Sequence, residues 1–585
     1  METTNLSKIR RDKMLNTINE IKKNITDEET LTNLSMIENE LTKKKYGLIW
    51  EEHEERVDKE LETKIPTFEE VKDKEIVSNP EDKFNFLLEG DNLHSLYLLE
   101  KTYKGLIDVI YIDPPYNTKN KDFIYNDQII GLEDSYRHSK WLSFMSKRLS
   151  IAKNLLSENG VIFISIDDNE MAQLKLLCDD IFGENSFVSQ LVWEKKKKGS
   201  FLSNQITNIK EYILVYCKNE KNFGGLIGQI NYCTETYPCI NASNKRQKRK
   251  ISKGIKSNFK EKNYIVKAGT IISDSTMDIK YITDLVIQDG IVKEDFIVEG
   301  NWRYSDEAMW QYSINKELYI TNALYIRRIV SEPRVKNLKD LLPRVGDNSI
   351  LGYDSKINPN NLFENGWGSN EDADNEVIDF FGKKRIFNYP KPCKLIKKII
   401  CSTNNKNAII CDFFAGTGTT AQAVLELNKE DGGNRQFILC TNNENNICED
   451  ITYQRIKTVI TGKRKDGSKY SEGIKANLKY YKCTYIPRIN TEDENLHNNL
   501  LINIKNLIQL ENGIEIDDNK IRVYLDEDEL DRFSKDQSEL DVCEKAYISS
   551  DILLTSMQET IFKNNNIEIY IIPEYYFEDE IMEVM

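Results

Sequence analysis

The chain has 585 residues, of which 39% are hydrophobic and 30% charged, and its formal net charge is −15. This length and composition predict several globular domains and exclude a disordered chain, and no apolar run reaches the roughly 18 residues of a membrane-spanning helix. The 11 cysteines are scattered and the four histidines form no ligand-spaced cluster, so we expect a cytoplasmic protein without a disulfide framework or a metal site.

Charge is distributed unevenly along the chain. Residues 491–585 hold 24 acidic and 7 basic side chains, whereas residues 190–260 hold 15 basic and 4 acidic ones. The overall acidity therefore belongs to the C-terminal part, and a basic segment lies in mid-chain. This asymmetry is typical of a DNA-binding chain with a separate acidic module.

The N-terminal third predicts a helical arm and then α/β structure. Residues 1–60 have apolar residues at roughly helical spacing, which predicts a helical arm over residues 1–75. Residues 76–189 then predict a βαβ unit, consisting of a buried strand over 106–112, a helix over 141–156 that is closed by Gly160, and a strand over 161–166.

The alternation of strands and helices is interrupted in mid-chain and then resumes. Residues 190–385 predict a separate, irregular, partly β domain inserted into the α/β body. Residues 386–470 return to α/β structure, with strands over 408–412 and 436–440 and a helix over 421–427. Residues 471–585 predict a small acidic α+β module that includes a strand over 568–572.

The first motif with chemical meaning follows the strand 106–112 and consists of Asp113, Pro114, Pro115 and Tyr116. The prolines fix the backbone. The Asp113 carboxylate and the Pro114 carbonyl can then accept both hydrogens of one exocyclic amine, and Tyr116 offers a flat face on which a base can stack. A strand-ending Asp-Pro turn without function is the alternative interpretation.

The second motif lies between the strand 408–412 and the helix 421–427. Its glycines allow a ligand close to the backbone at the carboxyl edge of a sheet. It is neither a Walker loop nor a three-glycine dinucleotide fingerprint, and it suits an adenosyl ligand without a pyrophosphate. The motif comprises Asp412, Phe413, Phe414, Ala415, Gly416, Thr417, Gly418 and Thr419. One strand later, Glu444 is an acid that could bind ribose hydroxyls.

Taken together, the two motifs resemble those of the amino-methyltransferases that act on DNA bases. The tetrapeptide precedes the glycine loop, with the basic insert between them, which is the permuted order of the β group. More closely, the chain resembles the Mod subunit of type III restriction–modification systems over roughly residues 40–480. The matching strings are residues 46–52, 89–92, 111–118, 123–127, 138–145, 164–170, 389–392 and 409–420.

The resemblance implies a fold and a domain order. The fold is a circularly permuted, Rossmann-like α/β sheet of the S-adenosylmethionine-dependent methyltransferases. Its catalytic half is residues 76–189, its cofactor half is residues 386–470, and a target-recognition domain, residues 190–385, is inserted between them. A helical arm, residues 1–75, and an acidic α+β module, residues 471–585, are additions to this core.

The resemblance also implies residue roles. Asp113, Pro114, Pro115 and Tyr116 would hold a flipped adenine, with Asp91 and Asn117 as weaker candidates for the adenine pocket. S-adenosylmethionine would be the cofactor, with Lys391 meeting its methionine carboxylate and Glu444 its ribose. The remaining cofactor residues would be Asp412, Phe413, Phe414, Ala415, Gly416, Gly418 and Thr419.

The expected reaction is methylation of adenine N6 in duplex DNA, without a cysteine nucleophile. Methylation of cytosine N4 is the nearest alternative, although a serine usually opens that tetrapeptide. An RNA or protein-glutamine amino-methyltransferase typically has an Asn-initiated tetrapeptide and the unpermuted order. A DNA-recognition scaffold without catalysis, or an orphan modification enzyme, are the remaining alternatives.

Partners follow from the charge distribution and from the resemblance. Double-stranded DNA is the expected substrate, with a homodimer, a Res subunit of helicase-like nuclease type and no membrane association. Two basic clusters in the predicted target-recognition domain would contact DNA phosphates, which position the protein without specifying sequence. These are Lys195, Lys196, Lys197 and Lys198, and Lys245, Arg246, Lys248, Arg249 and Lys250.

Overall fold

The computed structural model describes most of the chain, and it divides into two compact units. The described residues are 6–23, 25, 27–42, 50–118, 124–125, 128–129, 134–196, 206–274, 277–345, 356–383, 386–387, 389–487 and 493–572. The second unit comprises residues 226–338 and 358–364, and the first unit comprises the rest. Among the described helices, none is long and apolar enough to cross a membrane.

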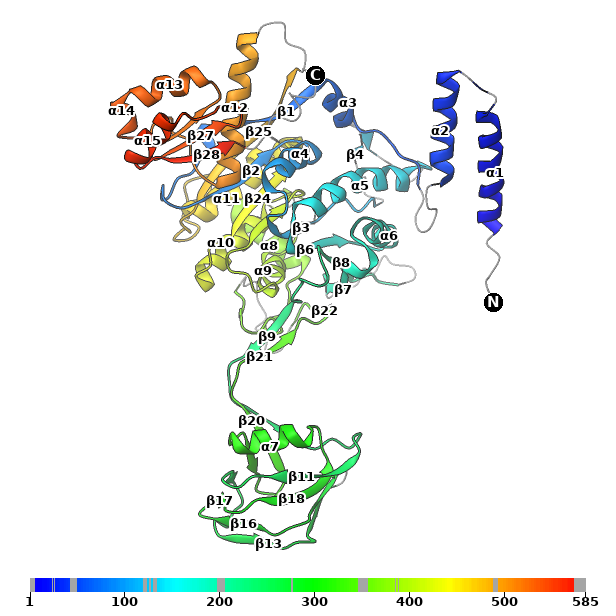
Figure 1. Ribbon diagram of the computed structural model, residues 1–585, viewed down its shortest axis with the longest axis vertical. Helices are drawn as coiled ribbons and strands as arrows, with labels where there is room; N and C mark the ends of the chain where they lie inside the picture. The colour runs from blue at the N-terminus through cyan, green and yellow to red at the C-terminus, as the bar shows by residue number, and fades with distance from the viewer. Residues whose placement is uncertain are drawn as a thin grey trace. The chain divides into compact units, whose positions relative to one another are not determined.

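A ten-stranded mixed sheet forms the centre of the first unit (Figure 1). Its inner strands β2, β24, β23, β3 and β6 are parallel neighbours, which confirms the predicted α/β fold with a parallel βαβ unit. The strand order across the sheet is β1 (Lys64–Glu70), β25 (Asn477–Pro487), β2 (Phe84–Glu89), β24 (Gln436–Thr441), β23 (Ile409–Asp412), β3 (Ile107–Ile112), β6 (Leu156–Ile166), β8 (Lys210–Cys217), β7 (Phe187–Glu194) and β22 (Leu341–Leu342).

Helices cover the sheet as two packed groups. One group consists of α4 (Asn92–Tyr103), α5 (Arg137–Leu155), α6 (Met171–Phe182) and α12 (Asp493–Asn512). The other consists of α9 (Cys393–Ser402), α10 (Thr419–Asp431) and α11 (Tyr453–Thr461), with α8 (Asn370–Phe381) bonded to the start of α9. Short helical turns accompany them at η1 (Lys72–Lys74), η2 (Glu184–Ser186), η3 (Glu444–Asn446) and η4 (Ile447–Thr452).

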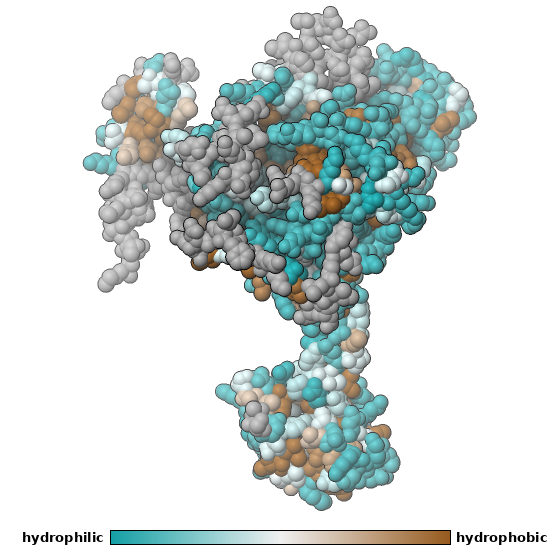
Figure 2. Space-filling model, turned by 180° about the vertical axis from the view of Figure 1, so that it is seen from behind, coloured by the Kyte–Doolittle hydropathy of each residue, from teal (hydrophilic) through white to brown (hydrophobic). Residues whose placement is uncertain are grey.

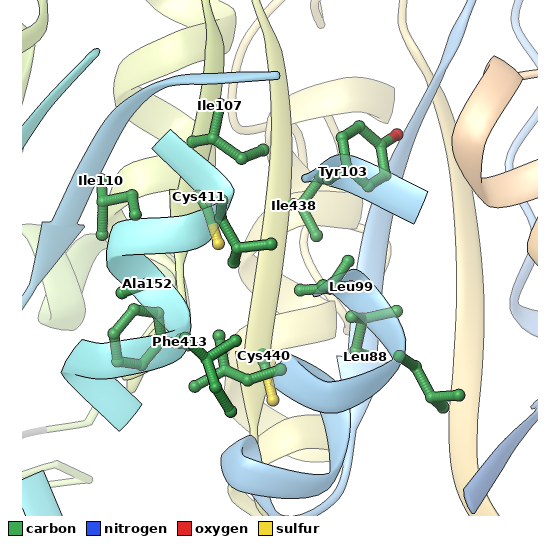
Figure 3. Close-up of a cluster of buried hydrophobic side chains, with 14 of the residues drawn as sticks. Leu88, Leu99, Tyr103, Ile107, Ile110, Ala152, Cys411, Phe413, Ile438 and Cys440 are labelled. Carbon is green, nitrogen blue, oxygen red and sulfur yellow. The ribbon is translucent and has the colours of Figure 1, made fainter. Parts of the chain in front are cut away.

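The core lies between the inner strands and the first helix group. Successive strand residues point to opposite faces, so alternate positions meet α4 and α5. Figure 3 shows Leu88, Ile110 and Cys411 of three strands near Leu99 of α4 and Ala152 of α5, and all five are almost fully buried. This packing buries one face of the inner strands beneath α4 and α5.

The connections leave the sheet in opposite directions between β23 and β3. Strand β3 continues through α5 to β6 on one side, and β23 continues through α10 to β24 on the other. The carboxyl ends of two such strands form a topological switch point, where open α/β sheets bind their ligands. Both predicted motifs begin at this point, because Asp113 follows β3 and Asp412 ends β23.

The second unit is a β structure with its own core. Its helix α7 (Asp306–Ile314) accompanies three small sheets (Figure 1). In strand order these are β10 (Glu235–Pro238), β20 (Ile326–Val330), β19 (Leu318–Ile320), β12 (Lys256–Ser257), β17 (Ile291–Val292), β16 (Leu285–Gln288) and β13 (Tyr264–Val266); then β11 (Arg246–Ile251), β18 (Phe296–Asn301), β15 (Asp278–Tyr281) and β14 (Ile271–Ser273); then β21 (Arg334–Asn337) and β9 (Ile227–Asn231).

The two ends of the chain add smaller elements. The N-terminal helices α1 (Leu6–Lys22) and α2 (Glu28–Thr42) contact each other, and α3 (Arg56–Thr63) leads into β1. Apolar side chains lie exposed on the first two, including Met14, Met36 and Ile37, and Figure 2 shows an apolar area there. A C-terminal parallel sheet has its own small core and consists of β26 (Ile521–Tyr524), β27 (Lys545–Ser549) and β28 (Glu568–Ile572). Its helices are α13 (Glu527–Lys535), α14 (Gln537–Leu540) and α15 (Ser556–Asn564). The remaining described elements are β4 (Ile124–Tyr125) and β5 (Gln128–Ile129), which form a hairpin.

The structure differs from the sequence predictions in three places. Gly160 does not close a helix, since α5 ends at Leu155 and Gly160 lies inside β6. Strands β7 and β8, residues 187–217, belong to the large sheet, so the second unit is shorter than the predicted insert 190–385. Strand β25 likewise pairs with β1 and β2, although residues 471–585 were expected to form a separate module.

Candidate active site

The tetrapeptide after β3 is held by hydrogen bonds from its neighbours. The Tyr116 hydroxyl donates to Asp113 Oδ1 at 2.7 Å, and the buried Trp141 of α5 donates its Nε1 hydrogen to the Pro115 carbonyl at 2.7 Å. The Asp113 side chain is 26% exposed, so it remains accessible at the switch point. Burial raises the pKa of Tyr116 well above its usual value, and the charge of Asp113 adds to this effect, so its hydroxyl stays protonated.

Three further charged groups gather at Asp113. Lys391 Nζ lies 2.7 Å from both Asp113 oxygens and 3.5 Å from Glu211 Oε2. Glu211, at the amino end of β8, also accepts from Lys195 at 2.8 Å. Lys391 and Glu211 are buried, and two carboxylates therefore face two ammonium groups.

The charges of this cluster support each other. Burial alone would raise the pKa of Glu211, but the charges of Lys391 and Lys195 more than offset it, and that pKa is lowered. Burial alone would lower the pKa of Lys391, but Asp113 and Glu211 reverse the direction. Both groups therefore stay ionised at neutral pH, as a buried pair with good hydrogen bonds can.

The sequence analysis did not identify Glu211, and it predicted other contacts for Lys195 and Lys391 than the structure shows. Lys195 is bonded to Glu211 inside the cluster and is not part of a free basic strip. Lys391 has its ammonium group on Asp113, whereas it was expected to face a cofactor carboxylate. The one sequence signal for Glu211 is an acid that follows Lys210 at the start of a strand whose remaining residues, 212–217, are aromatic or apolar.

The glycine loop after β23 is anchored at both ends. Asp412 accepts from the Phe414 backbone at 3.0 Å and from Thr420 Oγ1 at 2.6 Å. Burial raises the pKa of Asp412 to about 7, although these two hydrogen bonds lower it, and the charge of Asp113 adds to the rise. Phe413 is buried in the core, and Phe414 packs against the Phe144 ring, with 5.8 Å between ring centroids.

Two glycines of this loop have left-handed backbone conformations. Gly416 has φ 49° and Gly418 has φ 77°, a region that disfavours other residues. A Cβ atom on Gly418 would lie 3.1 Å from Thr452 Cγ2, and one on Gly416 would lie 3.3 Å from the Phe387 ring. The loop thus approaches its surroundings closely, which explains why glycine occupies both positions. Ala415 beside them is buried.

A single buried arginine of α11 braces the loop. Arg455 donates to Thr417 Oγ1 at 3.0 Å, Thr419 Oγ1 at 2.9 Å and Gln422 Oε1 at 2.7 Å. It also pairs with Glu376 of α8 at 3.1 Å, and Glu376 accepts the backbone N–H of Cys393. The glycine loop and the segment that carries Lys391 are therefore fixed to one another. The buried Thr419 side chain therefore bonds to Arg455, although it was expected to contact the cofactor.

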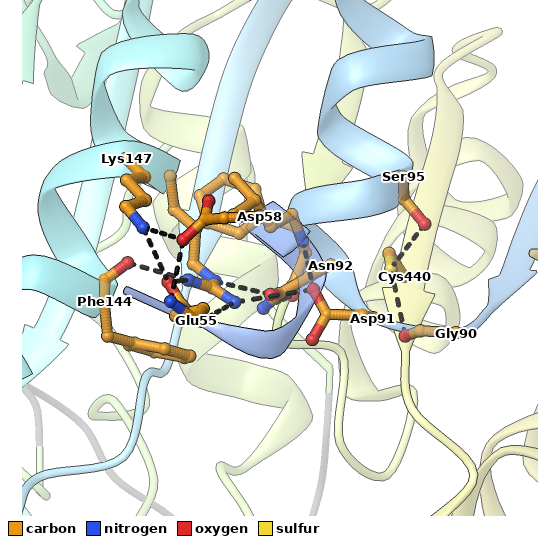
Figure 4. A network of polar contacts seen from close by, with 12 residues as sticks. Glu55, Asp58, Gly90, Asp91, Asn92, Ser95, Phe144, Lys147 and Cys440 are labelled. Atoms are coloured by element: carbon orange, nitrogen blue, oxygen red, sulfur yellow. Dashed lines mark hydrogen bonds and ion pairs between the residues drawn. The ribbon is translucent and has the colours of Figure 1, made fainter. Parts of the chain in front are cut away.

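Asp91 and its neighbours form a second brace at the start of α4 (Figure 4). Asp91 caps α4 by accepting from Leu93 N at 2.7 Å and lies 3.4 Å from the buried Arg148. Arg148 also pairs with Glu55 at 2.8 Å and bonds Asn92, whose amide donates to the Phe413 carbonyl at 2.9 Å. This network links the N-terminal segment to the glycine loop.

Asn117 and Glu444 lie at the two sides of the site. Asn117 is buried with φ 54° and donates to Glu170 Oε1 at 2.6 Å, which His138 Nδ1 also meets at 2.6 Å. Asn117 is thus turned towards Glu170. Glu444 is exposed after the carboxyl end of β24, the strand beside β23.

The second basic cluster consists of Lys245 and four residues of β11 in the second unit, and its members differ in exposure and in their partners. Arg249 points inward and bonds the carbonyls of Tyr304 and Lys248, which contradicts an exposed phosphate-binding role for it. Arg246 pairs with Asp278 and Glu299, and Lys250 pairs with Asp295. Lys245 and Lys248 are exposed. Of the first cluster, Lys196 is partly exposed, and Lys197 and Lys198 lie outside the described residues.

The residues at the switch point fit an adenosyl ligand with a methionine part. A glycine loop that approaches its surroundings closely, an ionisable acid at its start and an exposed acid one strand away could together hold such a ligand. Among the described residues, no group of three or more His, Cys, Asp or Glu side chains could hold a metal ion.

Comparison with known proteins places the site in a family. A family model described as DNA methylase matches residues 107–454, more than half of the chain. The Mod subunit of the type III restriction-modification enzyme StyLTI from Salmonella typhimurium (strain LT2) is 36% identical over 400 residues, 64% of this chain and 55% of that protein. The EcoPI Mod subunit of Escherichia phage P1 is 31% identical over 62% of this chain and 58% of its own length.

A shorter relative is covered more completely. The type II methyltransferase M.KpnI of Klebsiella pneumoniae is 31% identical over 377 residues, 62% of this chain and 82% of that protein. The chain spans little more than half the length of the two Mod subunits. The matched family segment contains both motifs, Asp113 to Tyr116 and Asp412 to Thr419.

Proposed function

The chain belongs to the DNA methylase family, and from that premise we propose that it transfers a methyl group from S-adenosylmethionine to N6 of an adenine flipped out of duplex DNA. The observation that carries the proposal is the position of the two motifs. The tetrapeptide and the glycine loop begin at the carboxyl ends of β3 and β23, on either side of the switch point. A base and a methyl donor held there would meet.

The tetrapeptide would capture the base. The Asp113 carboxylate and the Pro114 carbonyl accept the two hydrogens of the adenine amine and aim its nitrogen lone pair at the methyl group. Tyr116 stacks on the ring, which returns about 1–3 kcal/mol of the cost of unstacking. Catalysis then consists mainly of orientation and of hydrogen bonding to the reacting amine. The carboxylate that opens the tetrapeptide favours adenine N6 over cytosine N4.

The glycine loop and its neighbours would hold the cofactor. When bound, S-adenosylmethionine supplies an electrophilic methyl group on its sulfonium. Asp412 would meet its ammonium group, Glu444 its ribose hydroxyls, and the Gly416 and Gly418 backbone would allow it close to the sheet. Lys391 has three ammonium hydrogens, so it would give one to the methionine carboxylate while the others stay with the carboxylates of Asp113 and Glu211. Asp91 would act through the loop that it helps to brace.

The wider role is drawn from the Mod relatives. We place this chain as the modification and DNA-recognition subunit of a type III restriction–modification system in the bacterial cytoplasm. It would act as a homodimer, joined by a Res subunit for cleavage. The second unit lies inside the segment 190–385 and would select the sequence, with exposed lysines such as Lys245 and Lys248 on phosphates.

Modification mapping tests this proposal. The chain and its Asp113→Ala variant are expressed in a host without adenine methylation, and the host DNA is read by single-molecule sequencing. We expect N6-methyladenine at one short motif, absent with the variant, which should still bind S-adenosylmethionine. If N4-methylcytosine were found in place of N6-methyladenine, the target base would be cytosine. No modified base from a folded, cofactor-binding protein would overturn the proposal.

A further inference from the structure

Asp113 shares both of its described hydrogen-bond donors with one other carboxylate. The donors are Lys391 Nζ, 2.7 Å from each Asp113 oxygen, and the Tyr116 hydroxyl, 2.7 Å from Oδ1. Glu211 Oε2 lies 3.5 Å from the same ammonium and 3.3 Å from the same hydroxyl. Each donor can therefore turn from Asp113 to Glu211 with a small movement.

This sharing matters because an ion-paired carboxylate is a weak acceptor. The ammonium charge of Lys391 draws electron density from Asp113, and the Tyr116 proton occupies part of Oδ1. An adenine amine that hydrogen-bonds to Asp113 would compete with both. Lys391 is only 7% exposed, so an ammonium hydrogen that left Asp113 without another acceptor would carry a desolvation cost.

Glu211 is built to receive these donors. Its side chain is 8% exposed, and it comes from β8, whose amino end lies beside the carboxyl end of β6, because the two strands are antiparallel. Lys195 holds its other oxygen, Oε1, at 2.8 Å. Glu211 is therefore anchored through Oε1, while Oε2 faces Lys391 and Tyr116.

We propose that Glu211 is a positioning residue that takes over Lys391 and the Tyr116 hydroxyl when the target amine hydrogen-bonds to Asp113. The inference rests on the proposed function, since it concerns the same methyl transfer. No bond is made or broken at Glu211. It keeps the Lys391 charge partnered and leaves the Asp113 oxygens free to accept the amine hydrogen.

The test is the Glu211→Gln variant of the full chain. It keeps the shape of the side chain and removes the charge, so Lys391 should remain on Asp113. We expect the single-turnover rate of methyl transfer to plasmid DNA, at saturating S-adenosylmethionine, to fall about 10- to 100-fold at pH 7.5. The dissociation constants of S-adenosylmethionine and DNA should stay within about threefold, because neither ligand contacts Glu211 in this scheme.

The pH profile separates positioning from a structural role. The titratable groups that face Glu211 are Lys391 before α9, Lys195 after β7, Asp167 after β6, and Asp113, Tyr116 and Tyr111 on β3 and its loop. In the Glu211→Gln variant, Lys391 loses one of the two carboxylates that raise its pKa, so it should release its proton at a lower pH than in the wild type. Loss of that proton frees Asp113, so the variant should recover part of its rate at the alkaline end of the profile, whereas the wild type should not gain there.

Glu194→Gln is the matched control. Glu194 ends the neighbouring strand β7 and accepts from the Arg344 backbone at 3.0 Å, and Arg344 is not a member of the Asp113 cluster. It should lose less than about twofold in rate. A wild-type rate in Glu211→Gln, a loss without alkaline recovery, or a loss caused by weaker cofactor binding would overturn the inference. A wild-type chain that methylates no DNA would instead overturn the proposed function.

Discussion

Asp113, which lies 299 residues before Asp412 in the sequence, influences the ionisation of Asp412 across the junction of β3 and β23. Burial is the main cause that raises the pKa of Asp412 to about 7, and the negative charge of Asp113 raises it further. The two motifs are therefore one electrostatic site. A cation placed between them would favour the ionised form of Asp412.

The first prediction concerns the pH dependence of cofactor binding. A cationic cofactor at Asp412 should prefer the carboxylate, so affinity should rise as the pH rises through about 7. We expect the dissociation constant of S-adenosylmethionine, measured by calorimetry, to fall about tenfold between pH 5.5 and 8. The Asp412→Asn variant should bind more weakly and show a flat profile.

A matched control lies on the same strands at the opposite edge. Asp108, at the start of β3, is half-buried and accepts from the Ile409 backbone at 3.0 Å, and burial raises its pKa too. Asp108→Asn should retain the pH dependence of cofactor binding. An unchanged pH profile in Asp412→Asn would remove Asp412 from the cofactor site.

The second prediction separates backbone strain from crowding in the glycine loop. Gly418 and Gly432 both have left-handed backbones, with φ 77° and 68°, at the two ends of α10. A Cβ on Gly418 meets Thr452 at 3.1 Å, whereas nothing lies within 4 Å of one on Gly432. Both alanine variants should lose about 1 kcal/mol of stability from strain.

Cofactor affinity should distinguish the two variants. Gly418→Ala should weaken S-adenosylmethionine binding at least about tenfold, since Thr452 must shift and it also donates to the Gly416 carbonyl. Gly432→Ala should bind normally. Equal affinities in titration calorimetry would show that the loop does not touch the cofactor.

The sequence predicted what is local and missed what depends on pairing. Asp113 and Asp412 could be placed because each follows an apolar strand directly, and parallel strands bring their carboxyl ends to one edge. Glu211 could not, because its place in the site depends on β8 running antiparallel to β6. Nothing within residues 210–217 specifies that partner.

Two other differences have physical reasons of the same kind. Gly160 follows a helical pattern, yet β6 begins at Leu156 because pairing with β3 starts there. Arg249 belongs to a basic run, but the alternation of a strand turns it inward while Lys248 and Lys250 point outward. Composition alone does not distinguish the two faces of a strand.

The third prediction uses the buried acid beside the tetrapeptide. Burial raises the pKa of Glu170 to about 8, against the hydrogen bond from Asn117. A raised pKa means that the folded state binds a proton which the unfolded state has lost above about pH 4.5. The stability that Glu170 contributes is therefore present at low pH and is lost as the pH rises towards 8.

Glu170→Gln should remove this dependence, because a neutral amide can keep the contacts with Asn117 and His138. Between pH 5 and 9, the wild type should lose up to about 4 kcal/mol of unfolding free energy relative to the variant. Urea unfolding at several pH values measures this difference. Parallel stability profiles for the two proteins would show that Glu170 stays ionised.

The last prediction distinguishes the exposed lysines of the second basic cluster from its ion-paired and buried arginines. Lys245 and Lys248 are exposed, whereas Arg246 is ion-paired and Arg249 is buried. The double variant Lys245→Gln, Lys248→Gln should weaken binding to all DNA sequences alike and reduce the slope of log K against log salt by about 2. Arg249→Gln should instead lower thermal stability, because its buried hydrogen bonds are lost, and leave the salt slope nearly unchanged.

Fluorescence anisotropy with mixed-sequence duplexes over a salt series measures both slopes. An altered methylation motif without weaker binding in the lysine variant would mean that these side chains read bases and do not merely contact phosphates.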